Sequence, residues 1–296
     1  MPLSLLLQYL FSGITAGGIY AVIAIGFNII YNATGIINFA QGEFAMLGGM
    51  IAISFTAFMP LPAAIACAIL VTAALGGVLE FVFIRRMKNP TVIQMIIVTI
   101  GLSILLREAA LHIWDEKVHS LPYFTGNEIS SIRLFGACIS PQVLWVLGTC
   151  GAVVVSLSLF FAHTPAGRAM RACSADRIGA MLCGINARNM VTLSFMISAA
   201  IGALAGCVVS PITATTYDCG MPLAVKGFTV AIIGGLGNST GAVAAGLLLG
   251  IVEALCLAVM PMAFRDVVVI AILLAVLSFK PSGLFGNAAS QGQKEF

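Results

Sequence analysis

Two side-chain amides and a carboxylate interrupt an otherwise apolar stretch near the start of the chain. Asn38, Gln41 and Glu43 lie in GIINFAQGEFAMLGG (residues 35–49), between two long hydrophobic runs. If these runs cross a membrane, a carboxylate between them needs a protein interior or a water-filled cavity, where it finds a partner. We therefore interpret Asn38 and Gln41 as candidates to line a passage or to satisfy interrupted backbone. For Glu43 two roles stay open, as a residue that lines the passage and as a structural hydrogen-bonding partner.

A second polar turn, GGLGNSTGAVAAGLLLG (residues 234–250), repeats this pattern. Both segments place an asparagine between glycines and then enter an apolar stretch rich in Gly and Ala. Transporters are often built from two repeated halves, with substrate bound near the midplane where helices are interrupted. The echo predicts a two-fold pseudo-repeat with broken helices and adds Asn238 and Glu253 as passage candidates. A common Gly-rich turn between membrane helices is the alternative.

The sequence lacks the motifs of several classes of enzyme and metal-binding protein. None of the five lysines lies in a G-x-x-x-x-G-K-[ST] loop, which P-loop ATPases need to cradle phosphates. The three histidines have no metal-ligand spacing, the eight cysteines contain no C-x-x-C pair, and no G-x-S-x-G elbow is present. We therefore expect no ATPase, metal or cofactor site in this chain, and nothing in it supports an intramembrane enzyme.

The composition of the chain indicates a lipid environment. Its 296 residues are 60% hydrophobic and only 8% charged, with a mean hydropathy of +1.08. A soluble domain carries roughly 25% charged residues, so a water-facing surface cannot be built from this sequence. Apolar runs of about 18 residues or more then predict membrane-spanning helices. The predicted fold is an all-α, polytopic membrane bundle that forms one domain over residues 1–296.

We predict about eight or nine membrane crossings. The run over residues 223–236 is short for a span and is interpreted as a broken or re-entrant helix, or as no crossing at all. Because loops rich in Lys and Arg stay in the cytoplasm, we place the loop at 163–189 and the C-terminus inside. The loop at 115–141, which is mixed in charge, then lies on the outer side of the membrane. The apolar runs cover residues 6–31, 38–58, 62–84, 91–114, 142–162, 190–211, 223–236, 240–260 and 264–280.

Pairs of glycines with G-x-x-x-G spacing predict close helix packing. Small residues let helix backbones approach closely where no hydrophobic drive holds helices together in lipid. We expect these glycines to lie at helix–helix contacts rather than to form a pore. The pairs are Gly13/Gly17, Gly202/Gly206, Gly237/Gly241 and Gly246/Gly250.

The basic loop at 163–189 predicts two short helices. Thr164 followed by Pro165 is typical of an N-cap and the first helical position. A second helix is predicted to start at Ser174, and Gly184 suits the position just after its end.

The second of these helices carries an apolar stripe. Ile178, Met181 and Leu182 fall at i, i+3 and i+4, and Arg171 and Arg177 flank them. Such a helix can dock into a groove on a partner protein. It can also lie on anionic lipid headgroups, and the pattern alone does not separate these possibilities.

Taken in order, these segments resemble the bacterial branched-chain amino acid (LIV-type) ABC transporter permeases, a binding-protein-dependent transport family. The resemblance covers essentially the whole chain and ends in KPSGLFG, the usual ending of the family. The segments that match the family are GIYAVIAIGFNIIYNATGIINFAQGEFAMLGG (residues 18–49), TPAGRAMRACSADRIGAMLCGIN (residues 164–186) and GGLGNSTGAVAAGLLLGIVEAL (residues 234–255).

The resemblance implies a transport subunit rather than an enzyme. It implies a multi-pass protein of the bacterial inner membrane that translocates branched-chain amino acids. Its implied partners are a second, related permease chain, two cytoplasmic ATPases that bind ATP and Mg²⁺, and a periplasmic amino-acid-binding protein. Another amino acid, urea or a short amide stays open as the substrate. A stand-alone channel or secondary transporter is the alternative from a different class.

The resemblance also assigns the basic loop as the site that couples the permease to its ATPases. Ser174-Ala175-Asp176 stands where the Glu-Ala-Ala of the importer motif is sought, which is a departure from that motif. The implied coupling residues are Gly167, Arg168, Arg171, Asp176, Arg177, Ile178, Met181, Leu182 and Gly184.

Overall fold

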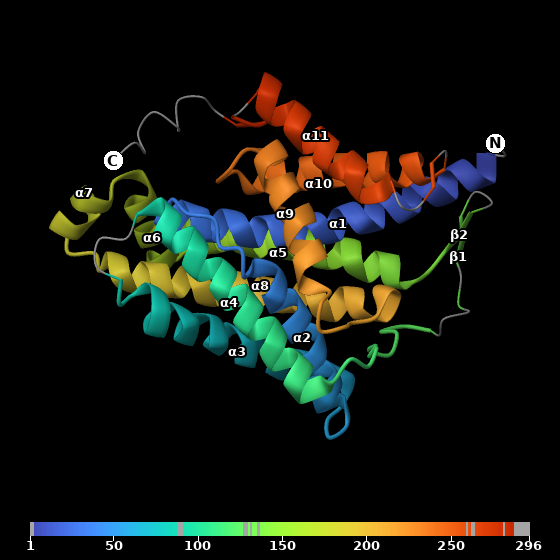
Figure 1. Ribbon diagram of the computed structural model, residues 1–296, viewed down its shortest axis with the longest axis horizontal. Coiled ribbons are helices and arrows are strands. Elements are labelled where there is room, and N and C mark those ends of the chain that lie inside the picture. Colours follow the sequence, from blue (N-terminus) through green and yellow to red (C-terminus); the bar gives the residue numbers. More distant parts are fainter. Residues whose placement is uncertain are drawn as a thin grey trace.

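The computed structural model describes residues 3–87, 91–126, 130, 132–134, 137–258, 260–261, 264–280 and 282–286. Lys88, Lys294 and the end of the C-terminal segment lie outside the described residues. The described chain is almost entirely helical, apart from a two-stranded antiparallel hairpin (Figure 1). Its elements are α1 (Leu3–Thr34), α2 (Gln41–Thr56), α3 (Leu61–Leu79), the π-helix η1 (Glu80–Ile84), α4 (Val92–Trp114), β1 (Ile132–Leu134), β2 (Ala137–Ile139), α5 (Gln142–His163), α6 (Pro165–Ala175), α7 (Arg177–Leu182), α8 (Ala187–Thr213), α9 (Gly220–Gly234), α10 (Ser239–Leu257) and α11 (Arg265–Phe279).

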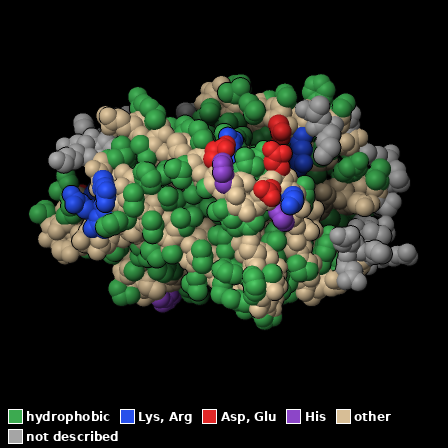
Figure 2. Space-filling model, turned by 60° about the horizontal axis from the view of Figure 1, so that its bottom comes forward, with side chains coloured by type: hydrophobic (Ala, Val, Ile, Leu, Met, Phe, Trp, Pro, Cys, Tyr) green, Lys and Arg blue, Asp and Glu red, His purple; other side chains and the backbone are tan. Residues whose placement is uncertain are grey.

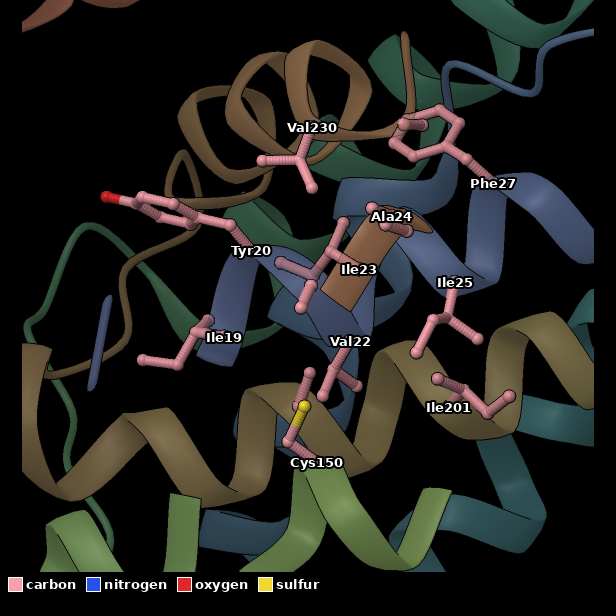
Figure 3. Packing of buried hydrophobic residues seen from close by; sticks show 14 of the residues in the cluster. Ile19, Tyr20, Val22, Ile23, Ala24, Ile25, Phe27, Cys150, Ile201 and Val230 are labelled. Atoms are coloured by element: carbon pink, nitrogen blue, oxygen red, sulfur yellow. The ribbon is translucent and has the colours of Figure 1, made fainter. Parts of the chain in front are cut away.

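Helix α1 forms the centre of the bundle. It contacts α5, α8, α9 and α10, and most of its second half is buried. Side chains of α1 pack there against Cys150 of α5, Ile201 of α8 and Val230 of α9 (Figure 3). In Figure 1, α1, α5, α8 and α10 follow the long axis of the molecule, whereas α2 and α9 cross it steeply near the middle. Helices α6 and α7 lie together at one end of that axis.

Six of the described helices are long and apolar enough to cross a membrane. These are α1, α4, α5, α8, α10 and the continuous helix formed by α3 and η1. A span needs about 20 residues, and α2, α9 and α11 have 16, 15 and 15. The predicted count of eight or nine crossings is therefore not confirmed, because three of the apolar runs form helices too short to span on their own.

The contact between α1 and α10 is made by two of the predicted glycine pairs. A Cβ atom added to Gly13 would lie 2.7 Å from the Gly250 carbonyl oxygen, and one on Gly17 would lie 2.8 Å from the Leu247 Cα. A Cβ atom on Gly246 would in turn lie 2.7 Å from the Gly17 carbonyl oxygen. The backbones touch, so no side chain fits between them, which confirms the packing role predicted for these pairs.

Candidate functional site

The chain is irregular between α1 and α2, where the first polar segment lies. Gly35 has a φ of +73°, and the chain regains helical structure at Gln41. Asn38 is buried, and its Oδ1 accepts a hydrogen bond from the Ala40 N–H at 3.1 Å. Its Nδ2 has no hydrogen-bond partner within the described part of the chain. Asn38 therefore supports the turn into α2, and its role in a passage stays a prediction.

Gln41 joins three helices in the core. Its Nε2 donates to the Ser198 carbonyl at 3.1 Å, which ties the start of α2 to α8. The Ser198 hydroxyl lies 2.6 Å from Gln41 Oε1 and 2.8 Å from the Gly26 carbonyl of α1. All three helices are thus held at this point by fully buried polar groups.

We expect Gln41→Leu to destabilise the bundle by about 1–3 kcal/mol, because it leaves buried groups of Ser198 without their partner. The measurement is the thermal unfolding midpoint of the purified chain in detergent. Gln8→Leu is the matched control, since Gln8 is exposed on α1. Equal midpoints for the two variants would contradict the structural role of Gln41.

Glu43 lies where the starts of α2 and α9 meet. Its Oε1 accepts a hydrogen bond from Ser103 Oγ of α4 at 2.9 Å, while Oε2 has no hydrogen-bond partner among the described residues. A Cβ atom on Gly220, the first residue of α9, would contact this carboxylate, and one on Gly42 would lie 2.7 Å from the Ala224 Cβ. The first turns of two helices therefore adjoin a buried carboxylate whose hydrogen bond comes from a third helix, α4.

Glu253 of α10 forms a buried ion-pair cluster. The Lys226 ammonium of α9 lies 2.8 Å from Glu253 Oε1, and Arg265 Nε of α11 pairs with the same oxygen. Lys226 also lies 3.2 Å from Asp266 Oδ1, and Arg265 Nη2 donates to the Tyr20 hydroxyl at 3.2 Å. Glu253 is 2% exposed and Asp266 is 74% exposed. Two cations thus share one buried carboxylate and one exposed carboxylate.

A cavity of about 240 Å³ lies beside this cluster. Lys226 and Arg265 border it, and residues of α1, α8 and the irregular segment 214–216 supply much of the remaining wall. None of the five predicted passage residues is among its lining residues.

Lys226, Arg265 and Tyr20 were not among the predicted site residues. Lys226 was a detectable signal, because it is the one charged residue within the apolar run over 223–236. The rule that intramembrane charges mark function applies to cations as much as to carboxylates.

Asn238 lies away from this cavity and caps α10. Its Oδ1 accepts a hydrogen bond from the Gly241 N–H, and its Nδ2 donates to the Phe285 carbonyl, both at 3.0 Å. It borders a larger cavity of about 600 Å³, which Arg171 of α6 also lines. Asn238 and Glu253 thus lie toward opposite ends of α10, so the structure does not bring the two predicted residues together.

Helix α6 begins as the sequence predicts. Thr164 caps it by accepting the Gly167 N–H at 3.0 Å, and Pro165 is its first residue. Met170 and Cys173 of α6 face inward. Burial raises the pKa of the Cys173 thiol, and nearby Arg177 opposes that rise.

The predicted start of the second helix at Ser174 is wrong. Helix α6 continues through Ala175, and Asp176 caps α7 by accepting the N–H groups of Ile178 and Gly179 at 2.9 and 3.0 Å. A carboxylate that accepts hydrogen bonds from two free N–H groups is a better cap than the serine two residues earlier. The end of α7 is as predicted: Gly184 has a φ of +82° and donates its N–H to the Met181 carbonyl.

We expect Asp176→Ala to destabilise α7 by about 1 kcal/mol, because both capping hydrogen bonds are lost. Hydrogen exchange of the amides in α7 measures the effect, and it should rise several-fold while exchange in α6 stays unchanged. Asp176→Asn is the control, since an asparagine side chain caps nearly as well. Unchanged exchange in the alanine variant would show that the cap does not hold α7.

Helix α7 exposes its apolar stripe at the end of the molecule. Ile178, Met181 and Leu182 are 69%, 50% and 85% exposed. The charged residues of this region are also exposed, namely Arg168, Arg171, Asp176 and Arg177. Figure 2 shows a group of Lys and Arg side chains at the same end. Large apolar side chains amid exposed charge mark a surface suited to a partner.

The sequence from residue 9 to residue 277 matches the model of one protein family, the branched-chain amino acid transport system permease component. The chain belongs to this family. The resemblance found in the sequence is thereby confirmed, and the family is one of permease components rather than catalytic subunits.

Curated relatives match along nearly the whole chain. The high-affinity branched-chain amino acid transport system permease protein BraD of Pseudomonas aeruginosa is 36% identical, over 95% of this chain and 96% of its own length. The corresponding LivH proteins of Salmonella typhimurium and Escherichia coli are 34% and 32% identical over the same shares. This chain therefore corresponds to almost the full length of these permeases.

Proposed function

We propose that this chain is the membrane-spanning permease subunit of an ATP-driven importer that carries branched-chain, aliphatic amino acids. The observation that carries the proposal is the identity of 32–36% to permeases of high-affinity branched-chain amino acid transport, across 95% of the chain. The six long apolar helices and the small cavity with two cations at its edge fit such a role. A zwitterion with an aliphatic side chain needs this combination of polar and apolar wall.

The proposed assembly is a pair of permease chains with two ATPases and a periplasmic binding protein, in the bacterial inner membrane. ATP and Mg²⁺ bind to the ATPase subunits. The exposed apolar stripe of α7 docks into a groove on an ATPase, with the arginines beside it setting the orientation. The cavity then alternates between the two sides of the membrane, because each ATPase state favours one arrangement of α6 and α7.

The chain crosses the membrane eight or nine times in this proposal, with two crossings made by broken helices. Helices α2 and α9 are each preceded by an irregular segment, at residues 35–40 and 214–219, and begin side by side at Gly42 and Gly220. An irregular segment plus a short helix covers the thickness that a single helix of 15 or 16 residues cannot.

The two halves of the pseudo-repeat are then α1–α4 and α8–α11, in opposite orientation. In each half a long helix leads through an irregular segment into a short one, as in other transporters with inverted repeats. This pairs residues 35–56 with residues 214–234. The sequence echo had paired the first segment with the turn at residues 234–241, which joins α9 to α10.

The proposed function is tested by uptake of radiolabelled leucine into proteoliposomes that contain the complete complex and ATP. We expect uptake that stops when the ATPases, ATP or the binding protein is left out. Uptake that persists without the ATPases would indicate a stand-alone channel or secondary transporter. Competition by valine and isoleucine, but not by urea or acetamide, would separate branched-chain amino acids from the other substrates of the alternatives.

A further inference from the structure

The ion-pair cluster around Glu253 leaves one cation with an exchangeable partner. Lys226, Arg265 and Glu253 together carry a net charge of +1, since two cations share one carboxylate. The balancing charge comes from Asp266, which lies 3.2 Å from Lys226 and is 74% exposed. An ion pair with so exposed a partner is weak, so another anion can replace Asp266 at little cost.

The cavity beside the two cations suits a small molecule with one apolar end. Its volume of about 240 Å³ is below the roughly 300 Å³ at which drug-sized ligand sites begin, and it matches a single amino acid better. Ile19, Val209 and Leu223 give it an aliphatic wall. Thr213 and Thr216 add hydroxyl groups that can accept a hydrogen bond from an ammonium.

We propose that Lys226 and Arg265 bind the α-carboxylate of the transported amino acid, which replaces Asp266 as the second anion on Lys226. The aliphatic side chain then lies against Ile19, Val209 and Leu223. Glu253 is a positioning residue, because it holds both cations at the edge of the cavity without lining it. This inference rests on the proposed function, since it names where and how that substrate binds.

Direct binding of radiolabelled leucine to the purified complex of permeases and ATPases, without the binding protein, tests the site. We expect Lys226→Gln to weaken binding roughly tenfold to a hundredfold, because it removes a charge-assisted hydrogen bond. Lys226→Arg keeps the charge and should stay within a few-fold of the unaltered protein. Asp266→Asn should tighten binding about two- to five-fold, because it removes the competing anion.

The Asp266 variant keeps the test decisive if the Lys226 variant fails to assemble. Asp266 is exposed, so its loss does not disturb the core. A purely structural cluster predicts unchanged or weaker binding for Asp266→Asn, which would overturn the proposal. Lys117→Gln is the matched control, because Lys117 and Asp115 form an exposed pair at 3.5 Å in a loop outside the cavity.

Competition by leucine analogues identifies the group that the cations bind. Leucinamide lacks the carboxylate and should compete poorly, whereas 4-methylpentanoate lacks only the ammonium and should compete measurably. Equal competition by leucinamide and leucine would overturn the proposal. The proposal would also be overturned if glycerol phosphate displaced leucine and 4-methylpentanoate did not, because that result indicates a site for lipid headgroups. If the complete complex takes up leucine with ATP but Lys226→Gln binds it normally, only this inference fails. If the unaltered complex shows no uptake, the proposed function itself fails.

Discussion

Gly17→Leu is expected to prevent α1 and α10 from packing and to remove most of the folded protein from the membrane fraction. The Gly17 backbone lies against Gly246 and Leu247 so closely that even a Cβ atom would lie 2.8 Å from the Leu247 Cα. Both neighbours are backbone atoms, which cannot rotate aside as a side chain would. Overpacking a core usually costs about 1–3 kcal/mol of stability. We expect the cost of Gly17→Leu to lie at or above the upper end of this range, because the two helices must separate to make room for the side chain.

The measurement for Gly17→Leu is the yield and elution profile of the detergent-extracted chain. Gly101→Leu is the matched control, because Gly101 lies mid-helix in α4 with nothing within 4 Å of an added Cβ atom. We expect the control to extract and elute as the unaltered protein does. A Gly17→Leu variant with normal yield and profile would mean that the α1–α10 contact does not hold the bundle together.

Met181→Asp is expected to uncouple the permease from its ATPases while leaving the membrane bundle intact. Met181 is 50% exposed in the middle of the α7 stripe, so its substitution removes no core contact. An aspartate at that place must be desolvated inside an apolar groove, which costs about 2 kcal/mol or more and weakens docking roughly 30-fold. Leucine uptake should fall by at least about tenfold as a result.

Co-purification of the ATPases with the tagged permease measures the effect of Met181→Asp. Met181→Leu is the control, because it keeps an apolar side chain of similar size and should retain the ATPases. The thermal midpoint of the permease alone should be the same for both variants. ATPases recovered at the normal yield with the aspartate variant would show that the stripe faces something else, such as lipid headgroups.

Local signals predicted the helices of this protein well. The lack of charge determined that lipid surrounds the chain, and the apolar runs located the helices to within a few residues. The caps Thr164 and Gly184 were predicted correctly, because an N-cap hydrogen bond and a glycine in the left-handed conformation depend only on the neighbouring residues in the sequence. Ser174 misled the prediction of the second start, since a serine and an aspartate two residues apart both fit a cap by pattern.

The partners of the buried charges could not be predicted in the same way. Lys226 and Glu253 lie 27 positions apart, and no spacing rule relates the facing sides of two different helices. The same holds for Gln41 and Ser198, which meet only because α2 begins deep inside the bundle beside α8.

By itself, the sequence determined the membrane environment, the helices and the glycine pairs that let α1 and α10 touch, because composition, period and small-residue spacing act locally. Only the tertiary structure decided which glycine pair faces which, where α2 and α9 begin, and that Lys226 and Arg265 converge on Glu253. The physical reason is that a buried charge requires a partner but does not specify its position in the chain. That position follows from how the helices pack.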